Sequence, residues 1–409
     1  MNIRALKELQ RCLLLLTVVA FLPVSHAQPG HDNPDWVTSW STSPSTLPAQ
    51  DEPENTLENQ TVRLIVHTSI GGSAIRLRLS NYHGDRPLHI AAATVAQQAA
   101  AAQATGPISR LRFGGEEGVV IPRGATVFSD PLVFEVPQSE NLAVSLYLPG
   151  NSGFITQHAL ANQISYISEP GDFSETSAMP VAEETQGWPF LTAIDVLPDE
   201  PTTAIVTLGD SITDGWGSTA SANQRWPNHF QHRLYADDSV ADYAVINAGI
   251  SGNRVTTEGN ALFGQNLQAR LERDVLAMSN VSHIVLLEGI NDIGMSASDE
   301  LIEADSIIAA YRQVLARAHA RGIKVIAGTL LPYEGAAYYT EAGNAVRQAV
   351  NAFIRSSGEF DGVIDFVPAV ADPANPNRIR PEFTEDNLHP NDAGYRAMAE
   401  SIDLDLFRQ

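Results

Sequence analysis

The sequence predicts an α/β protein in two parts, a β-rich N-terminal region followed by a domain built on a parallel sheet. From Asp35 to about Leu197, apolar residues recur at every second position in short runs, which is typical of antiparallel strands with one buried face. After Pro201, continuous apolar runs alternate with amphipathic stretches of helical length, which is typical of parallel strands covered by helices. We therefore predict domains over residues 28–197 and 198–409.

In the first part, two alternating runs flank a pair of glycines. Val62 to His67 and Ile75 to Ser80 lie on either side of Gly71-Gly72, and this pattern predicts a β-hairpin. Further short runs at Leu88–Val95, Arg110–Phe113, Val119–Ile121, Thr126–Phe128, Leu132–Val136 and Leu142–Leu148 favour a sandwich or jelly-roll-like domain. The Ala/Gln-rich segment Ala91–Ala104 fits a strand followed by a loop.

The second part contains five candidate strands and five candidate helices. The strands are Ala204–Leu208, Tyr243–Asn247, His283–Leu287, Lys324–Leu330 and Gly362–Phe366, and the helices are Trp226–Tyr235, Asn266–Met278, Glu300–Arg321, Ala342–Ser356 and Asn391–Leu406. In such a fold, ligands bind beyond the C-terminal ends of the strands. The residues that follow each strand are therefore the first candidates for a site.

Composition and charge exclude several classes of protein. The 409 residues are 44% hydrophobic and 18% charged, with 48 Asp and Glu against 25 Lys and Arg. That balance suits folded domains with real cores, not a disordered or disulfide-stapled chain. The net charge of −23 would repel nucleic acid and anionic membranes. We expect a neutral, cationic or small partner, and the oligomeric state stays open.

The N-terminus has the pattern of a secretory signal, residues 1–27. Arg4, Lys7 and Arg11 precede the apolar run Cys12–Val24, and Ser25-His26-Ala27 supplies small residues for cleavage. The alternative, an anchor helix, needs ~20 apolar residues, and this run is shorter. Cleavage near Ala27 would remove three basic residues and one acidic residue, change the charge from −23 to −25, and discard the only cysteine. We expect a secreted or periplasmic protein without disulfides.

Four polar clusters follow the predicted strands or lie in the last loop. They are Leu208-Gly209-Asp210-Ser211, Asn247 to Asn253, Gly289-Ile290-Asn291-Asp292 and Asp386 to Pro390. A serine at a strand-to-helix turn is a candidate nucleophile, here Ser211. An aspartate three residues before a histidine can hold the imidazole in one tautomer, so Asp386 and His389 form a candidate pair. Each cluster alone has a plain structural interpretation as a turn or helix cap, but their joint order favours chemistry.

These four clusters resemble the blocks of the SGNH hydrolases, the GDSL-type esterase/lipase family, with Ile212 where the family name has leucine. The resemblance implies a flavodoxin-like three-layer α/β/α domain with a five-stranded parallel sheet. It implies Ser211 as nucleophile, His389 as base and Asp386 as orienting acid. It further implies an oxyanion hole from the Ser211 and Gly252 amides and the Asn291 side chain. The longer context, with Asn223 to Pro227, is similar to an arylesterase/acylhydrolase branch associated with xylan-degrading bacteria.

The function that follows is a secreted serine carboxylic-ester hydrolase acting on short-acyl or aryl esters, with acylated plant polysaccharide as a further substrate class. No cofactor and no metal is implied. Two alternatives stay open: a lipase or lysophospholipase, and a carbohydrate-binding protein with secondary esterase or acyltransferase chemistry. We expect no nucleic-acid partner and no stable membrane insertion.

Several other side chains have competing interpretations. We expect Asp210, Asp214 and Asp292 to make structural hydrogen bonds and not to bind a metal. We expect a shared solvent-facing side for His229 and His232. Trp36 and Trp40 fit packing better than a sugar platform. The sequence leaves open whether Trp226, Tyr333 and Phe383 line a pocket or belong to the core.

Overall fold

The computed structural model describes residues 35–46, 56–240, 242–296 and 300–408. Residues Asp35–Gln409 form one compact unit. The predicted signal segment, residues 1–27, lies outside the described residues. No helix within the described ranges is long and apolar enough to cross a membrane. We call residues 35–197 the β-rich half and residues 198–408 the α/β half, and a domain boundary between them stays a prediction.

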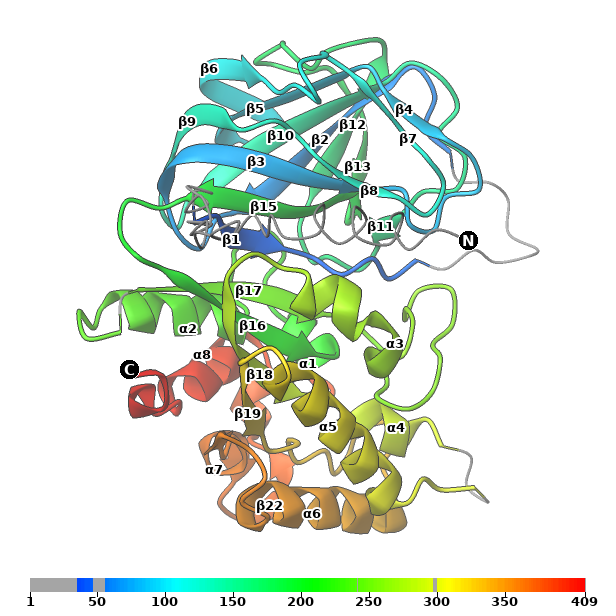
Figure 1. Cartoon of the computed structure of the whole chain (residues 1–409). Coiled ribbons are helices and arrows are strands. Elements are labelled where there is room, and N and C mark those ends of the chain that lie inside the picture. The colour runs from blue at the N-terminus through cyan, green and yellow to red at the C-terminus, as the bar shows by residue number, and fades with distance from the viewer. Residues whose placement is uncertain (1–34, 47–55, 241, 297–299, 409) are drawn as a thin grey trace, which may run out of the picture. The chain divides into compact units, whose positions relative to one another are not determined.

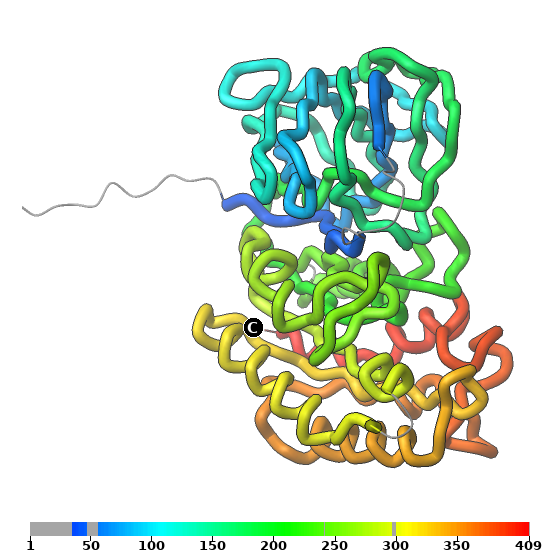
Figure 2. The backbone as a smooth tube through the Cα atoms, turned by 90° about the vertical axis from the view of Figure 1, so that its right-hand side faces the viewer, coloured from blue at the N-terminus to red at the C-terminus, as the bar shows by residue number. Residues whose placement is uncertain are grey.

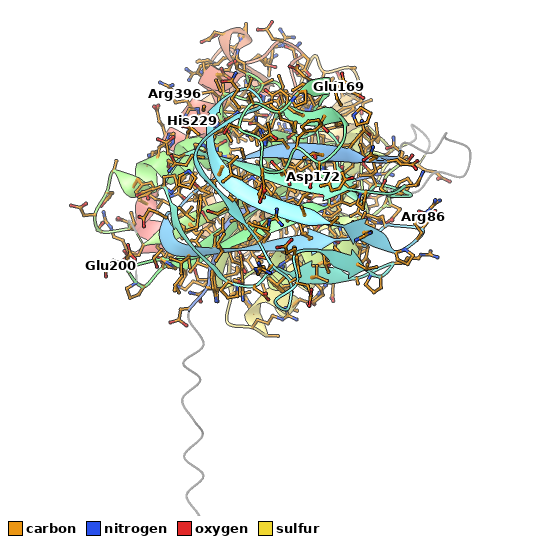
Figure 3. The ribbon with its side chains drawn as sticks, turned by 90° about the horizontal axis from the view of Figure 1, so that it is seen from above. Arg86, Glu169, Asp172, Glu200, His229 and Arg396 are labelled. Carbon is orange, nitrogen blue, oxygen red and sulfur yellow. The ribbon has the colours of Figure 1, made fainter. Side chains whose placement is uncertain are left out.

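The β-rich half is a sandwich of two antiparallel sheets (Figure 1). One sheet has the order β1 (Val37–Ser41), β15 (Leu191–Leu197), β3 (Gly72–Ser80) and β8 (Thr126–Phe128), with β9 (Leu132–Val136) also on β3. The other has the order β13 (Val181–Thr185), β12 (Ser165–Pro170), β2 (Gln60–His67), β10 (Asn141–Leu148), β5 (Ala92–Ala100) and β6 (Gln103–Arg110). Two small pairs complete it: β4 (Leu88–Ile90) with β7 (Val119–Ile121), and β11 (Gln157–His158) with β14 (Trp188–Pro189). Figure 3 looks down onto this sandwich, with the α/β half behind it.

The predicted hairpin around Gly71-Gly72 is wrong, because β2 and β3 belong to different sheets. The segment between them crosses from one sheet to the other, and its backbone bonds to neighbours outside both strands. The Ser69 amide donates to the Ser39 carbonyl at 3.0 Å, and the Ile70 amide donates to Ser39 Oγ at 3.0 Å. A Cβ on Gly72 would lie 2.4 Å from the Leu197 carbonyl oxygen. The glycine is needed for close packing at this crossing, not for a hairpin turn.

The Ala/Gln-rich segment holds the hairpin that the sequence did not predict. β5 and β6 pair antiparallel, and Ala101 between them has a left-handed φ of 49°. The expected run Leu88–Val95 is divided into β4 and β5, which lie in different sheets. Alternating patterns therefore located strands in this half but did not determine their partners.

The α/β half confirms the predicted fold class. Its sheet is parallel, with the order β17 (Tyr243–Gly249), β16 (Thr203–Gly209), β18 (Val281–Leu287), β19 (Lys324–Gly328) and β20 (Gly362–Ile364). Counted within this half, the order is 2-1-3-4-5, as in flavodoxin-like folds. The chain reverses direction across the sheet at β16, which has β17 on one side and β18 on the other. A ligand site is expected beyond the C-terminal ends of these three strands.

Helices pack around this sheet, and Figure 2 shows the helical yellow-to-red part of the chain below the β-rich half. The longer ones are α2 (Trp226–Tyr235), α5 (Ala304–His319), α6 (Glu341–Ser356) and α8 (Asp392–Glu400), and the five-residue α3 (Leu267–Leu271) continues into a π-helical turn. The shorter elements are α1 (Ser211–Asp214), the π-helical turn η1 (Glu272–Leu276), α4 (Ile290–Gly294), α7 (Val367–Val370), β21 (Ala371–Asp372), β22 (Asn375–Ile379), η2 (Pro381–Phe383) and η3 (Leu404–Phe407). Helices α2, α7 and α8 pack together, as do α3, α5 and α6.

Strand β1 joins the two halves. It pairs with β15 in the sandwich and packs against β17 of the α/β half. Ser41 Oγ donates to the Asn247 carbonyl at 3.3 Å. Trp40 is buried and meets Trp188 edge-to-face, with 5.0 Å between ring centroids. Trp36 is also buried, so both tryptophans serve packing, as the sequence predicted.

Candidate active site

Ser211 lies at a tight turn between β16 and α1. The Asp210 side chain caps α1 by accepting from the Ile212 amide at 3.0 Å. Gly209 permits the turn, because a Cβ there would lie 2.4 Å from the Leu287 carbonyl oxygen of the neighbouring strand. The turn holds the serine hydroxyl at the C-terminal edge of the sheet, where the fold places ligands.

Ser211, His389 and Asp386 form a continuous hydrogen-bonded chain. Ser211 Oγ lies 2.8 Å from His389 Nε2, and His389 Nδ1 lies 2.7 Å from Asp386 Oδ2. The carboxylate accepts from Nδ1–H, so Nε2 is free to accept the serine proton. The other carboxylate oxygen, Oδ1, accepts from the Leu388 and His389 amides at 2.9 and 2.8 Å. Burial alone would raise the pKa of Asp386, but these bonds from His389 and Leu388 hold it below its ordinary value.

Gly252 and Asn291 line the same pocket as Ser211. Gly252 has a φ of 75°, and a Cβ there would lie 2.4 Å from the Phe263 ring, so only glycine fits this turn. The Asn291 amide is oriented from both ends. Its Nδ2 donates to the Asn253 carbonyl at 3.0 Å, and its Oδ1 accepts from the Tyr338 hydroxyl at 3.2 Å. One Nδ2 proton is left for a ligand.

The pocket in front of Ser211 has a volume of about 260 Å³ and mainly apolar walls. Besides the predicted residues, it is lined by Leu160, Trp216, Ser251, Phe263, Met295, Tyr338 and Leu388. Trp216 lies near the His389 imidazole, with 6.4 Å between ring centroids. Among the described residues, Leu160 is the one wall residue that the β-rich half contributes. An acyl or aryl group of modest size fits this space.

The sequence did not decide whether three aromatic residues line the pocket or belong to the core. The structure places none of the three in the pocket wall. Trp226 and Tyr333 are completely buried in the core, and Phe383 packs on the core from η2. Trp216 follows the Ser211 block directly in the sequence, so its place near the pocket could have been predicted. Tyr338 and Leu160 carry no local signal, because only the tertiary fold brings them to Ser211.

Arg270 on α3 binds the loops beneath the site and was not predicted from the sequence. Its fully buried guanidinium donates to the carbonyls of Gly209 at 3.0 Å and Ala248 at 2.7 Å, and to Asn253 Oδ1 at 2.8 Å. These acceptors lie at the ends of β16 and β17 and beside Gly252. One side chain therefore connects the turn before Ser211 with the loop that carries Gly252.

Two buried carboxyls lie near this arginine. Glu288 approaches Arg270 Nη2 at 3.4 Å, and burial raises the pKa of Glu288 to about 8. Burial likewise raises the pKa of Asp210 to about 7. Asp292 accepts from the Val255 and Thr256 amides at 2.7 and 2.9 Å. Asp210 and Asp292 thus make structural hydrogen bonds, as expected.

The third aspartate, Asp214, is held from the β-rich half. Its Oδ1 lies 3.0 Å from His158 Nε2, and its Oδ2 accepts from the Ser251 amide at 2.9 Å and hydroxyl at 2.7 Å. His158 Nδ1 lies 2.7 Å from the Ser43 carbonyl oxygen. Both ring nitrogens face acceptors, so both carry protons and His158 is an imidazolium. Burial works against its charge, but Asp214 and Ser43 raise the pKa of His158 above its ordinary value. This buried ion pair fixes Ser251, the residue before Gly252.

The expectation for His229 and His232 is half wrong. His232 is exposed, but His229 is buried. Figure 3 labels His229 beside Arg396 of α8. Burial, with the Arg396 charge, lowers the pKa of His229. Within the part of the chain that the structure describes, no three His, Cys, Asp or Glu side chains gather as a metal site.

A serine hydroxyl bonded to an imidazole, at the strand edge of a flavodoxin-like sheet, defines the class of serine hydrolases. The sequence model of the GDSL-like lipase/acylhydrolase family matches residues 207–397. The α/β half therefore contains a GDSL-like lipase/acylhydrolase domain, which makes the chain a serine ester hydrolase. The matched range contains Ser211, Gly252, Asn291, Asp386 and His389.

Several solved structures are similar to about half of this chain. A GDSL-like lipase from Bacteroides thetaiotaomicron is 21% identical, with a TM-score of 0.37, and the match covers 50% of this chain and 87% of that one. An acetyl xylan esterase is 26% identical, with a TM-score of 0.38 and coverage of 48% and 96%. An acetylxylan esterase from Geobacillus stearothermophilus is 20% identical, with a TM-score of 0.39 and coverage of 51% and 95%. Among curated proteins, none matches this chain.

Proposed function

We propose that the protein cleaves carboxylic esters through an acyl-enzyme on Ser211. Ser211 Oγ attacks the ester carbonyl carbon while His389 Nε2 takes the hydroxyl proton. His389 then gives this proton to the departing alcohol, and water releases the acyl group by the same sequence in reverse. Asp386 keeps the imidazole in the required tautomer. The observation that carries the proposal is the Ser211–His389–Asp386 chain with distances of 2.8 and 2.7 Å.

The oxyanion of the tetrahedral intermediate would be held by three donors. They are the amides of Ser211 and Gly252 and the remaining Nδ2 proton of Asn291. Neither amide has an acceptor among the described residues, and all three residues line one pocket. Donors that are already oriented stabilise the charge as it forms, without reorganisation during the reaction.

The substrate we propose is a short-acyl or aryl ester. The pocket volume of about 260 Å³ and its walls of Leu160, Trp216, Phe263 and Met295 favour an apolar group of limited length. An acylated plant polysaccharide would meet the same pocket with its acyl group. The pocket walls do not determine which alcohol leaves. They also allow an alcohol to replace water as the acceptor of the acyl group.

The first experiment replaces the nucleophile. Ser211→Ala should lower kcat on an aryl acetate by about 10⁴-fold or more, while the control Ser306→Ala, on the exposed side of α5, leaves kcat unchanged. A fluorophosphonate should add one covalent adduct to the parent protein and the control but none to Ser211→Ala, as read by intact mass. Full activity in Ser211→Ala would reject the assignment.

The second experiment addresses the substrate. p-Nitrophenyl esters of increasing acyl length should give the highest kcat/KM at short chains, and activity that peaks at long chains would favour a lipase. Acetylated xylan, feruloylated arabinose and phospholipid, assayed side by side, separate the polysaccharide and lipid classes. We also propose export of the chain after cleavage near Ala27, which N-terminal sequencing of the protein recovered outside the cytoplasm would check.

A further inference from the structure

A second cavity, of about 250 Å³, lies between the two halves and shares no lining residue with the Ser211 pocket. Strands β3 and β8 form one wall of this cavity, which we call the Arg78 cleft. The turn η1 and the residues after it form the other wall. Junctions of this kind are frequent locations of small-molecule sites. Its volume is below the ~300–1,000 Å³ of pockets for drug-sized ligands, so a ligand here would be small.

Among the described residues, no carboxylate lies within salt-bridge distance of the buried Arg78 guanidinium, and Asp195, which is paired with Arg76, acts on it only at longer range. Arg78 is 6% exposed, and its Nε is buried and bonds to no acceptor. In the described part of the chain its only hydrogen-bond acceptor is the sulfur of Met278, 3.6 Å from Nη1. Sulfur is a weak acceptor, and a buried charge without a partner is strongly destabilising.

The two neighbouring arginines differ from Arg78, because each has its own carboxylate. Arg76 donates to Asp195 Oδ2 from Nε at 3.0 Å and from Nη2 at 2.8 Å. Arg273 donates to both oxygens of Asp274, at 2.5 and 2.9 Å. Asp274 lines the cleft, but its charge is already balanced by Arg273. Of the three arginines Arg76, Arg78 and Arg273, Arg78 is therefore the one without a carboxylate of its own among the described residues.

The remaining walls suit a ligand that combines hydroxyl groups with an apolar face. The Phe128 ring is 44% exposed, and the Cζ atoms of Arg76 and Arg78 lie 4.6 and 4.8 Å from its centroid. Ser80 and Thr126 also line the cleft, and the Thr126 hydroxyl donates to Ser80 Oγ at 3.3 Å. The walls thus combine one unpaired cation, an aromatic edge and neutral hydroxyls.

We propose that the Arg78 cleft binds a carboxylate on a small hydroxylated ligand, with a sugar acid of one ring as the upper size. A guanidinium matches the two oxygens of a carboxylate in a planar, bidentate arrangement. A single unpaired cation beside Asp274 balances one negative charge, which disfavours a phosphate dianion. The hydroxyls of Ser80 and Thr126 bond to ligand hydroxyls, and Phe128 covers the apolar face of the ring.

Isothermal titration of the full chain with sodium glucuronate, glucose and inorganic phosphate tests this site. We expect saturable binding of glucuronate, none of glucose, and phosphate binding at least tenfold weaker. Arg78→Met should weaken glucuronate binding by at least tenfold. The matched control is Arg112→Gln, an exposed residue that bonds to the Gly115 carbonyl and Glu117, and it should bind as the parent does. Ser211→Ala should also bind as the parent does, because the cleft is separate from the active site.

Three results would overturn the proposal: no glucuronate binding by the parent, equal binding by Arg78→Met, or phosphate binding as tight as glucuronate binding. Loss of binding in Ser211→Ala would instead assign the ligand to the active site. Thermal unfolding separates a ligand site from a structural role of Arg78. We expect Arg78→Met to keep or raise Tm, because it removes an unpaired buried charge, and we expect glucuronate to raise the Tm of the parent only. A marked fall of Tm in Arg78→Met would mean that the arginine holds the halves together.

Discussion

The two halves of the molecule reach the Ser211 pocket in different ways. In the α/β half, Ser211, Gly252 and Asn291 each follow a strand of one parallel sheet, so the fold brings them together at one edge. Among the described residues of the β-rich half, Leu160 lines the pocket, and His158 from the same segment contacts Asp214 beside it. His158 does not line the pocket, and it acts through Asp214 and Ser251.

This difference separates two kinds of contribution to catalysis. Groups that meet the reacting atoms change the chemical step directly, whereas groups that hold them affect the rate through their position. We therefore expect large losses of kcat from substitutions beside Ser211 in the α/β half. Substitutions in the β-rich half should give smaller losses.

The largest effect should come from Asp386→Asn. The amide cannot accept the Nδ1–H bond and favours the wrong imidazole tautomer, so we expect kcat to fall by about 10³- to 10⁴-fold. KM should change little. Asp405→Asn, which alters an exposed carboxylate on η3, is the matched control. A loss below tenfold would remove Asp386 from the catalytic chain.

Asn291→Ala should lower kcat by about 10²- to 10³-fold, because it deletes one oxyanion donor. Tyr338→Phe keeps that donor and removes only the bond to Asn291 Oδ1, so we expect a loss of a few-fold. Steady-state kinetics on one aryl acetate provides both values. Equal losses in the two variants would mean that Asn291 acts by packing with Tyr338 and not as a donor.

His158→Gln tests the contribution of the β-rich half. We expect kcat to fall by about tenfold with little change in KM, since Ser251 and the neighbouring Gly252 lose a fixed support. Activity is counted per site labelled by fluorophosphonate, so that unfolded protein does not enter the rate. Leu160→Ala, from the same segment, should instead raise KM for apolar esters. A His158→Gln variant with the parent kcat per labelled site would limit this half to lining the pocket.

Glu288→Gln should change the pH dependence of stability and not the rate. The pKa of Glu288 is raised to about 8 in the folded protein, so its contribution to stability is present below its unfolded pKa and is lost as pH rises toward 8. Glutamine mimics the protonated form at every pH. We expect similar Tm values for parent and variant near pH 5 and a higher Tm for the variant near pH 8.5. Glu359→Gln, at an exposed ion pair with Arg312, is the control, and a parallel fall of Tm for the parent and Glu288→Gln would contradict the prediction.

The parallel sheet could be predicted because each of its strands is a continuous apolar run with a helix beside it in sequence. The predicted Trp226–Tyr235 helix has the observed bounds. The four polar clusters could be located for the same reason, since each follows directly on its strand or lies in the final loop. Their residues lie together in the structure, while the roles of Ser211, His389 and Asp386 stay predictions.

What the sequence did not reveal depends on contacts between distant residues. Alternation places one face of a strand in a core but does not select its partner, so β2 and β3 were paired wrongly. Arg270, His158 and Tyr338 reach the site from positions without a motif. Their function is decided by which carbonyl, carboxylate or amide the tertiary fold puts beside them.

Strand β1 has a consequence for how this chain folds during synthesis. Its Thr38 hydroxyl bonds to Asp195 at 2.8 Å, across 157 positions, and its pairing with β15 closes one sheet of the sandwich. Such long-range pairing makes folding slow, and it cannot occur until the ribosome has released nearly the whole β-rich half. Until then the edge of β1 is open to pair with other chains. Expression at lower temperature, or with chaperones that shield strand edges, should therefore raise the yield of folded enzyme.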